Sequence, residues 1–291
     1  MHSALCQSGI DFEIIIADDG SEEDCREKIE NFFQEMAWER YLFVKSEKNQ
    51  GTVKNILNAL DFVSGEYIYL TSPGDLLYDA YVMRDFYAFA KEKQCDICFG
   101  NAVYYKPGEG KVVSVIREPA RISLYHRDVS RMRKQLGIFC DSILGASFFR
   151  TKEAAEKYIG GIAHVSKYVE DYTSTCYAVL DGADICHYDR TMLFYEYETG
   201  ISASKDTVWQ ERLELDYMGV FRFLREKYPG NPVLDWAYLY KKCKCLWLGR
   251  LYKICKHPWV FVNACINKSY LVVKSDCTKE LQKKLDDHIK L

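Results

Sequence analysis

The sequence predicts an α/β protein, in which a mostly parallel sheet is flanked by helices and followed by a helical C-terminal extension. Strand and helix signals alternate from the start of the chain to about residue 115, which is typical of such a sheet. Two of the apolar strands end at carboxylates, one at Asp18 and the other shortly before Asp75. A Pro-Gly-Asn-Pro sequence at residues 229–232 marks a linker, so we place a main domain at 1–228 and the extension at 229–291.

The individual elements follow from local patterns. Residues 12–17, 41–44 and 66–70 are short apolar runs typical of buried strands. Residues 22–36 and 52–63 have apolar side chains at helical spacing. The other predicted elements are a helix at 79–93, a hairpin of strands at 96–105 and 111–116, a strand at 143–149 and a helix at 208–228.

Composition indicates a globular protein of the cytoplasm. The chain has 291 residues, 48% of them apolar and 28% charged, with a net charge of −3. No uncharged apolar run approaches the roughly 18 residues that span a bilayer, and no signal peptide opens the chain. Twelve cysteines in a chain of this length do not indicate a disulfide framework. We expect Cys95 and Cys98 in a buried strand rather than in a metal or redox site.

The C-terminal extension is basic and aromatic. Residues 235–291 hold 12 Lys or Arg against 5 Asp or Glu. Its aromatic residues include Trp236, Tyr238, Tyr240, Trp247, Tyr252, Trp259 and Phe261. This mixture suits peripheral contact with an anionic membrane, and it equally suits a helical cap packed on the main domain. No nucleic-acid-binding module accompanies the basic residues, so we expect no nucleic-acid partner.

The carboxylates at the strand ends indicate a ligand site. Open α/β sheets bind ligands at the edge where the strands end, and Asp18 and Asp75 both belong to that edge. One carboxylate can hold a ribose hydroxyl or a base N–H, and another can anchor Mg²⁺ or Mn²⁺ beside phosphate oxygens. Asp and Asn also make turns and caps, so a single such motif is weak evidence.

Two further segments carry candidate residues. Asn49, Gly51 and Asn55 lie between the two strands, where a glycine allows close backbone approach and the asparagines can bond a nucleotide or cap the helix. Glu170 and Asp171 open a predicted helix. Asp171 can act as a general base, and acids at this position also complement the helix dipole.

Together these motifs resemble the family 2 glycosyltransferases, inverting enzymes of the GT-A fold. The matching segments are Asp18-Asp19-Gly20-Ser21, Asn49-Gln50-Gly51, Ser72-Pro73-Gly74-Asp75, and Gly160-Gly161 followed by Glu170-Asp171. The resemblance covers roughly residues 1–205 and is most specific over the first 80.

The resemblance implies a function for each motif. The nucleotide-sugar-binding residues would be Asp18, Asp19, Gly20, Ser21, Asn49, Gly51 and Asn55. Asp75 would hold Mn²⁺ or Mg²⁺, and Asp171, with Glu170 beside it, would be the catalytic base. The implied reaction is metal-dependent hexosyl transfer from a nucleotide sugar, most commonly a UDP-sugar, to an acceptor hydroxyl by inverting single displacement.

The resemblance also implies a setting for the reaction. The acceptor would be a saccharide or a lipid-linked glycan, in the synthesis of a surface polysaccharide or glycoconjugate. The protein would be cytoplasmic, with peripheral contact at the inner face of the cell membrane. We expect loops such as residues 117–135 to select donor and acceptor.

The chain departs from the family pattern at three places. The family's first strand, which would lie beside residues 12–17, is missing, and we expect the chain to be an N-terminally shortened form of a longer protein. The acidic cluster at residues 72–75 keeps one carboxylate, Asp75. Residues 195–202 lack the usual His or Arg, and Glu198 there can approach the metal or face solvent.

These departures leave alternatives open. The first is a protein of the same fold that binds nucleotide sugars or acts as a scaffold without turnover. The second is a receiver-type signalling domain, which also places paired acids after a first buried strand. It requires an Asp directly at the end of a later strand, whereas Asp75 lies five residues beyond Leu70.

Overall fold

A computed structural model describes residues 1–116, 148–197, 206–242 and 275–289, together with the single positions 247, 251 and 255. The strands are β1 (Ile14–Asp18), β2 (Tyr41–Lys45), β3 (Tyr67–Tyr69), β4 (Leu76–Leu77), β5 (Ile97–Lys106), β6 (Lys111–Ile116), β7 (Phe148–Thr151) and β8 (Ile185–Glu196). The helices are α1 (His2–Leu5), α2 (Arg26–Glu35), α3 (Thr52–Leu60), α4 (Val82–Lys93), α6 (Lys152–Ile162), α7 (Asp171–Asp181), α8 (Thr207–Lys227), α9 (Pro232–Lys242) and α12 (Ser275–Ile289).

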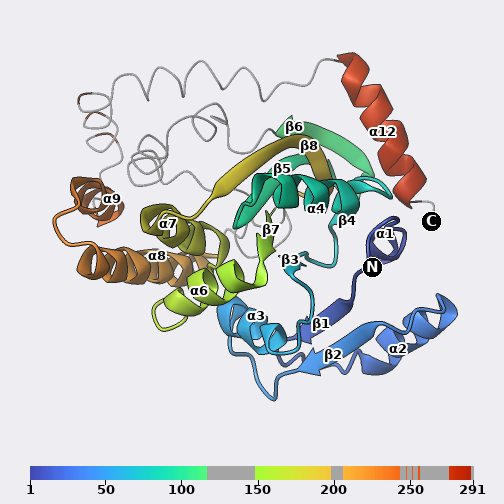
Figure 1. The fold of residues 1–291 in the computed structure, drawn as a ribbon, viewed down its shortest axis with the longest axis horizontal. Coiled ribbons are helices and arrows are strands. Elements are labelled where there is room, and N and C mark those ends of the chain that lie inside the picture. The colour runs from blue at the N-terminus through green and yellow to red at the C-terminus, as the bar shows by residue number, and fades with distance from the viewer. Residues whose placement is uncertain are drawn as a thin grey trace.

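The predicted α/β class is confirmed, but most strand pairings in the larger sheet are antiparallel, whereas a mostly parallel sheet was predicted. A parallel pair, β1 and β2, stands apart from a six-stranded sheet of order β3-β7-β5-β8-β4, with β6 also paired to β5 (Figure 1). Among the described strands of the larger sheet only β5 and β8 pair in parallel, and the other pairings are antiparallel. A buried strand has the same apolar pattern in either direction, so the sequence could not decide this point.

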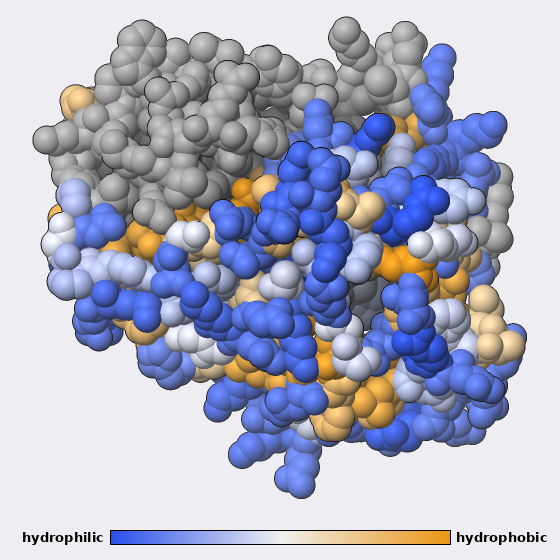
Figure 2. Space-filling model, viewed as in Figure 1, coloured by the Kyte–Doolittle hydropathy of each residue, from blue (hydrophilic) through white to orange (hydrophobic). Residues whose placement is uncertain are grey.

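Among the described residues, the strands are divided into two sheets between β1 and β3. Within the described residues β1 pairs only with β2, and β3 pairs only with β7. The N–H of Ile14 donates to the Arg40 carbonyl, and the backbone carbonyl of Asp18 accepts from the Ser46 N–H. The backbone N–H and C=O groups of residues 14, 16 and 18 therefore face β2. The backbone N–H and C=O groups of residues 15 and 17 therefore face an edge to which no described strand is paired. All of β1 is only half-buried, and an apolar patch lies over β1 and β2 in Figure 2.

Helices cover the larger sheet on both faces. On one face α6, α7, α8 and α9 enclose a core that includes Phe148, Ile162, Phe221 and Leu234, all nearly fully buried. On the other face α4 packs Phe86 and Ala90 against β5 and β8. Helix α3 lies over β1 and packs on α6 (Figure 1).

Cys98 lies in β5 and both Cys95 and Cys98 are buried, as predicted.

The described parts of the C-terminal extension contact the main body of the protein. Helix α12 lies along β6 (Figure 1), where Leu285 is fully buried and Gln282 accepts a hydrogen bond from the N–H of Val112 at 2.9 Å. Tyr238 of α9 lies under the guanidinium of Arg225, 4.5 Å from its ring centroid. None of the described helices is long and apolar enough to cross a membrane.

Several sequence predictions fall outside the described residues. They are the loop 117–135, the first part of the strand 143–149, Glu198, and much of the aromatic tail, including Tyr252, Trp259 and Phe261. Trp247 is described and is 62% exposed. The domain boundary at residues 228/229 stays a prediction, as does membrane contact.

Candidate functional site

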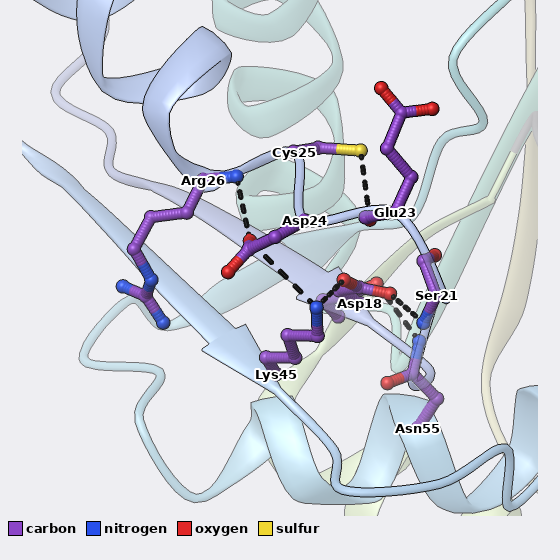
Figure 3. A network of polar contacts seen from close by, with 9 residues as sticks. Asp18, Ser21, Glu23, Asp24, Cys25, Arg26, Lys45 and Asn55 are labelled. Atoms are coloured by element: carbon purple, nitrogen blue, oxygen red, sulfur yellow. Dashed lines mark hydrogen bonds and ion pairs between the residues drawn. The ribbon is translucent and has the colours of Figure 1, made fainter.

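Asp18 ends β1 in a network of polar contacts. Its Oδ1 accepts a hydrogen bond from the Ser21 N–H at 2.9 Å, and its Oδ2 lies 3.7 Å from the ammonium of Lys45 (Figure 3). Partial burial raises the pKa of Asp18, but the hydrogen bonds from Ser21 and the charge of Lys45 outweigh it and leave the pKa lowered. The Asp18 carboxylate is therefore ionised near neutral pH and lies beside the ammonium of Lys45.

Asp19 holds the loop that precedes α3. Its Oδ1 accepts from the N–H of Gln50 and its Oδ2 from the N–H of Gly51, both at 2.8 Å. Gly20 has φ +77°, and a Cβ there would lie 2.6 Å from the backbone carbon of Lys48. Asp19 and Gly20 thus bring the loop containing Asn49 against the end of β1.

Gly51 and Asn55 have contacts that the sequence did not predict. Gly51 has φ +93°, and a Cβ there would lie 2.6 Å from the carbonyl oxygen of Lys167. The close approach that this glycine permits is therefore to another loop of the protein. Asn55 donates from Nδ2 to the carbonyl of Ala17 at 3.0 Å, which ties α3 to the open edge of β1.

Asp75 is a buried carboxylate with one oxygen uncommitted. Its Oδ1 accepts from the N–H of Glu196 at 3.1 Å, while its Oδ2 has no hydrogen-bond partner among the described residues. Burial is the main reason that the pKa of Asp75 is raised to about 6, and the charge of Glu196 adds to it. An uncommitted, buried carboxylate oxygen is the kind of atom that a bound cation satisfies.

Glu196 is a second acid at this place, and no sequence motif predicted it. It ends β8, and its carboxylate lies against Gly74, where an added Cβ would be 1.3 Å from Glu196 Oε2. Two carboxylates supply oxygen ligands that Mg²⁺ and Mn²⁺ accept, so these residues fit such an ion. No group of three or more candidate ligands occurs in the described ranges, so a cation here would need further oxygens from its ligand.

Glu170 and Asp171 lie at the N-terminus of α7, as predicted. Burial and the neighbouring Asp171 charge raise the pKa of Glu170, against the opposing charge of Arg150. Arg150 extends from β7, is 2% exposed, and its Nε and Nη2 have no hydrogen-bond partner among the described residues. A buried positive charge therefore lies close to the acidic pair.

The structure joins some of the predicted residues directly. The Asp19 loop contacts the loop before Glu170, because Val53 at the start of α3 donates to the Lys167 carbonyl at 3.1 Å. Asp75 is joined instead to Glu196 of β8, 121 residues away in sequence. The roles assigned to these residues stay predictions.

The fold and the acidic strand ends define an α/β protein of the GT-A type. The chain belongs to glycosyl transferase family 2, whose model matches residues 1–157. It is accordingly a protein of the nucleotide-sugar glycosyltransferase class. A search of curated protein sequences found no match.

Solved structures with a similar fold include several of TarS from S. aureus. TarS residues 1–349 in complex with UDP matches with a TM-score of 0.57 at 15% identity, over 88% of this chain and 69% of that one. The complex of the same fragment with UDP-GlcNAc matches with a TM-score of 0.52 at 16% identity, over 79% and 68%. A longer TarS structure matches with a TM-score of 0.57 at 14% identity, over 84% of this chain but only 40% of that one.

Proposed function

We propose that this protein transfers a hexose from a UDP-sugar to an acceptor hydroxyl by inverting single displacement. The observation that carries the proposal is the buried Asp75 carboxylate, one oxygen of which has no hydrogen-bond partner among the described residues, next to Glu196, whose carboxylate lies against Gly74. The chain that holds them belongs to glycosyl transferase family 2. The fold neighbours that contain UDP and UDP-GlcNAc support the choice of uridine nucleotides as the first donors to test.

The donor would lie at the ends of β1 and β3. Ser21 and Asn49 flank the end of β1, where Gly20 brings the two loops together. Asp18 keeps its charge at neutral pH and offers a carboxylate to ribose hydroxyls or a base N–H. Asp19 would affect donor binding indirectly, through the position of the neighbouring loop, because both of its oxygens already accept hydrogen bonds from that loop's backbone.

Asp75 and Glu196 would hold Mn²⁺ or Mg²⁺. When bound, such an ion neutralises the charge that develops on a departing diphosphate. Burial and the charge of Glu196 raise the pKa of Asp75, and a bound cation would offset this cost of the ionised carboxylate. Metal and diphosphate are therefore expected to bind together.

Asp171 would be the base that takes the proton from the acceptor hydroxyl. Glu170 beside it is the member of the pair whose raised pKa favours a bound proton, so the pair can carry one proton and still present a carboxylate. The positive charge of Arg150 limits the cost of burying that carboxylate.

The proposal also includes the acceptor and the location. The acceptor would be a polysaccharide or a lipid-linked glycan, and the reaction would take place at the cytoplasmic face of the membrane. They rest on the family resemblance and on the basic, aromatic composition of the tail. A second candidate is a nucleotide-sugar-binding protein without turnover. The open edge of β1 favours it, because the strand that ends in Asp18 lacks a neighbour on that side within the described residues.

Thermal unfolding with UDP and a panel of UDP-sugars, with Mn²⁺ and then with chelator, tests the proposal. Ligand at a hundred times its Kd adds about 2.7 kcal/mol to the free energy of unfolding. We expect a metal-dependent shift that Asp75→Asn abolishes. Asp85→Asn is the matched control, because Asp85 is an exposed acid paired with Arg84.

A second measurement distinguishes the transferase from the binding protein without turnover. It is the release of UDP from whichever UDP-sugar binds. Turnover supports the transferase, and binding without turnover supports the second candidate. Absence of any nucleotide-dependent shift would contradict both for this chain.

A further inference from the structure

The loop before the acidic pair is fastened by a single carboxylate from another helix. Asp216 of α8 is 8% exposed, and its Oδ2 accepts hydrogen bonds from three consecutive backbone N–H groups. The donors are Lys167 at 2.9 Å, Tyr168 at 2.5 Å and Val169 at 3.1 Å. Successive N–H groups that converge in this way form an anion-binding concavity, and a charged acceptor makes each bond stronger.

Helix α8 is shaped to bring Asp216 to this loop. Gly219 lies one turn further along α8, on the same face, and a Cβ there would lie 2.6 Å from the carbonyl oxygen of Val165. Trp209, earlier on α8, makes an edge-to-face contact with Tyr168, their ring centroids 5.1 Å apart. The helix and the loop are therefore in close contact on both sides of Asp216.

The same loop reaches both parts of the candidate site. At one end the Lys167 carbonyl accepts from Val53 and lies against Gly51, whose own N–H is held by Asp19. At the other end Val169 is followed directly by Glu170 and Asp171. Asp216 thus fixes the segment between the donor loop (residues 49–51) and the acidic pair (Glu170 and Asp171).

Asp216 does not hold α7 in place alone. The C-terminal end of α7 is anchored separately by Asp181, which accepts from Tyr228 at 2.8 Å and lies 2.6 Å from the ammonium of Lys157. Loss of the Asp216 bonds should therefore displace the N-terminal end of α7 while leaving the helix packed.

We propose that Asp216 is a positioning residue for sugar transfer, which sets the place of Asp171 relative to the bound donor. This inference rests on the proposed function. Its physical basis is that a base must be held within a fraction of an ångström of its proton, and a displacement of about 1 Å can cost a hundredfold in rate.

The test compares Asp216→Asn with Asp181→Asn. For each variant we would measure UDP affinity by calorimetry, the melting temperature, and kcat and KM for UDP release with water as acceptor. The substrate is UDP-GlcNAc or the UDP-sugar that most stabilises the unmodified chain. We expect Asp216→Asn to lower kcat by about a hundredfold with UDP affinity within a few-fold, because Asp19 still holds the donor loop. We expect Asp181→Asn to lower the melting temperature and leave kcat within a few-fold.

A second variant keeps the test valid if Asp216→Asn does not fold. Gly219→Ala retains the Asp216 charge and moves α8 away from Val165, so kcat should fall again with UDP affinity retained. Equal kcat values in Asp216→Asn, Gly219→Ala and Asp181→Asn would overturn the inference and leave the proposed function intact. An unmodified chain that neither binds UDP nor releases it from a UDP-sugar would overturn the proposed function and this inference with it.

Discussion

The carboxylate of Glu196 lies on the backbone of Gly74, so the residue before Asp75 has no room for a side chain. An added Cβ would be 1.3 Å from Glu196 Oε2 and 2.4 Å from Cδ. The end of a glutamate can rotate away, so a substitution here should move the carboxylate and leave the fold in place. This contact lies beside Asp75, which is 121 residues from Glu196 in the sequence.

Gly74→Ala should therefore abolish the Mn²⁺-dependent part of stabilisation by UDP. The free energy of unfolding without ligand should change by less than about 1 kcal/mol, because the three nearest atoms to the added Cβ all belong to the Glu196 side chain, which can shift. Thermal unfolding with UDP, with and without Mn²⁺, measures both quantities. Gly108→Ala is the matched control, because a Cβ at that turn meets nothing within 4 Å. Retention of the full Mn²⁺ effect in Gly74→Ala would argue against a role for Glu196.

Asp75 should make the metal-free protein more stable as the pH falls. Its pKa is about 6 in the folded protein, above the ordinary value of 3.8, so the folded state binds the proton more tightly. The resulting stability is present at low pH and is lost as the pH rises toward and through 6. Asp75→Asn should remove this dependence and raise stability at pH 7.5 by up to about 3 kcal/mol. Urea unfolding in chelator at pH 5 and 7.5 measures the difference, and parallel pH profiles for the two proteins would contradict the assignment.

The open edge of β1 predicts different effects of proline at adjacent positions. The backbone N–H of Ile16 faces β2, whereas that of Ile15 faces the edge to which no strand of the described residues is paired. Ile16→Pro should cost about 1–3 kcal/mol more than Ile15→Pro, because it removes a ladder hydrogen bond and leaves the acceptor on β2 unpaired. Urea unfolding of the two variants makes the comparison. An equal, large loss at both positions would show that another segment pairs with this edge.

Helix α12 should contribute to the stability of the main domain. Leu285 is fully buried against Val103, Val112 and Phe194 of the sheet, so Leu285→Ala should cost about 2–5 kcal/mol. Ile289 in the same helix is 51% exposed, and Ile289→Ala should change stability far less. Similar, small losses for both variants in chemical denaturation would mean that the helix is not docked in solution.

Local patterns predicted many of the elements accurately. The predicted helix at 52–63 is α3 (Thr52–Leu60), and the predicted hairpin strands are β5 (Ile97–Lys106) and β6 (Lys111–Ile116). The long helix at 208–228 is α8 (Thr207–Lys227). These assignments succeed because helical spacing, turns and strand alternation depend on residues close together in the chain.

The sequence by itself determined the family, the α/β class and the acids at the strand ends, because the residues of each motif are neighbours in the chain. Only the tertiary structure decided the strand directions and the partners of those acids. Glu196 meets Asp75 across 121 residues, and Asp216 meets Lys167 across 49. Such contacts form when separate helices and strands pack against one another. The residues next to each acid in the chain have no pattern that predicts its partner.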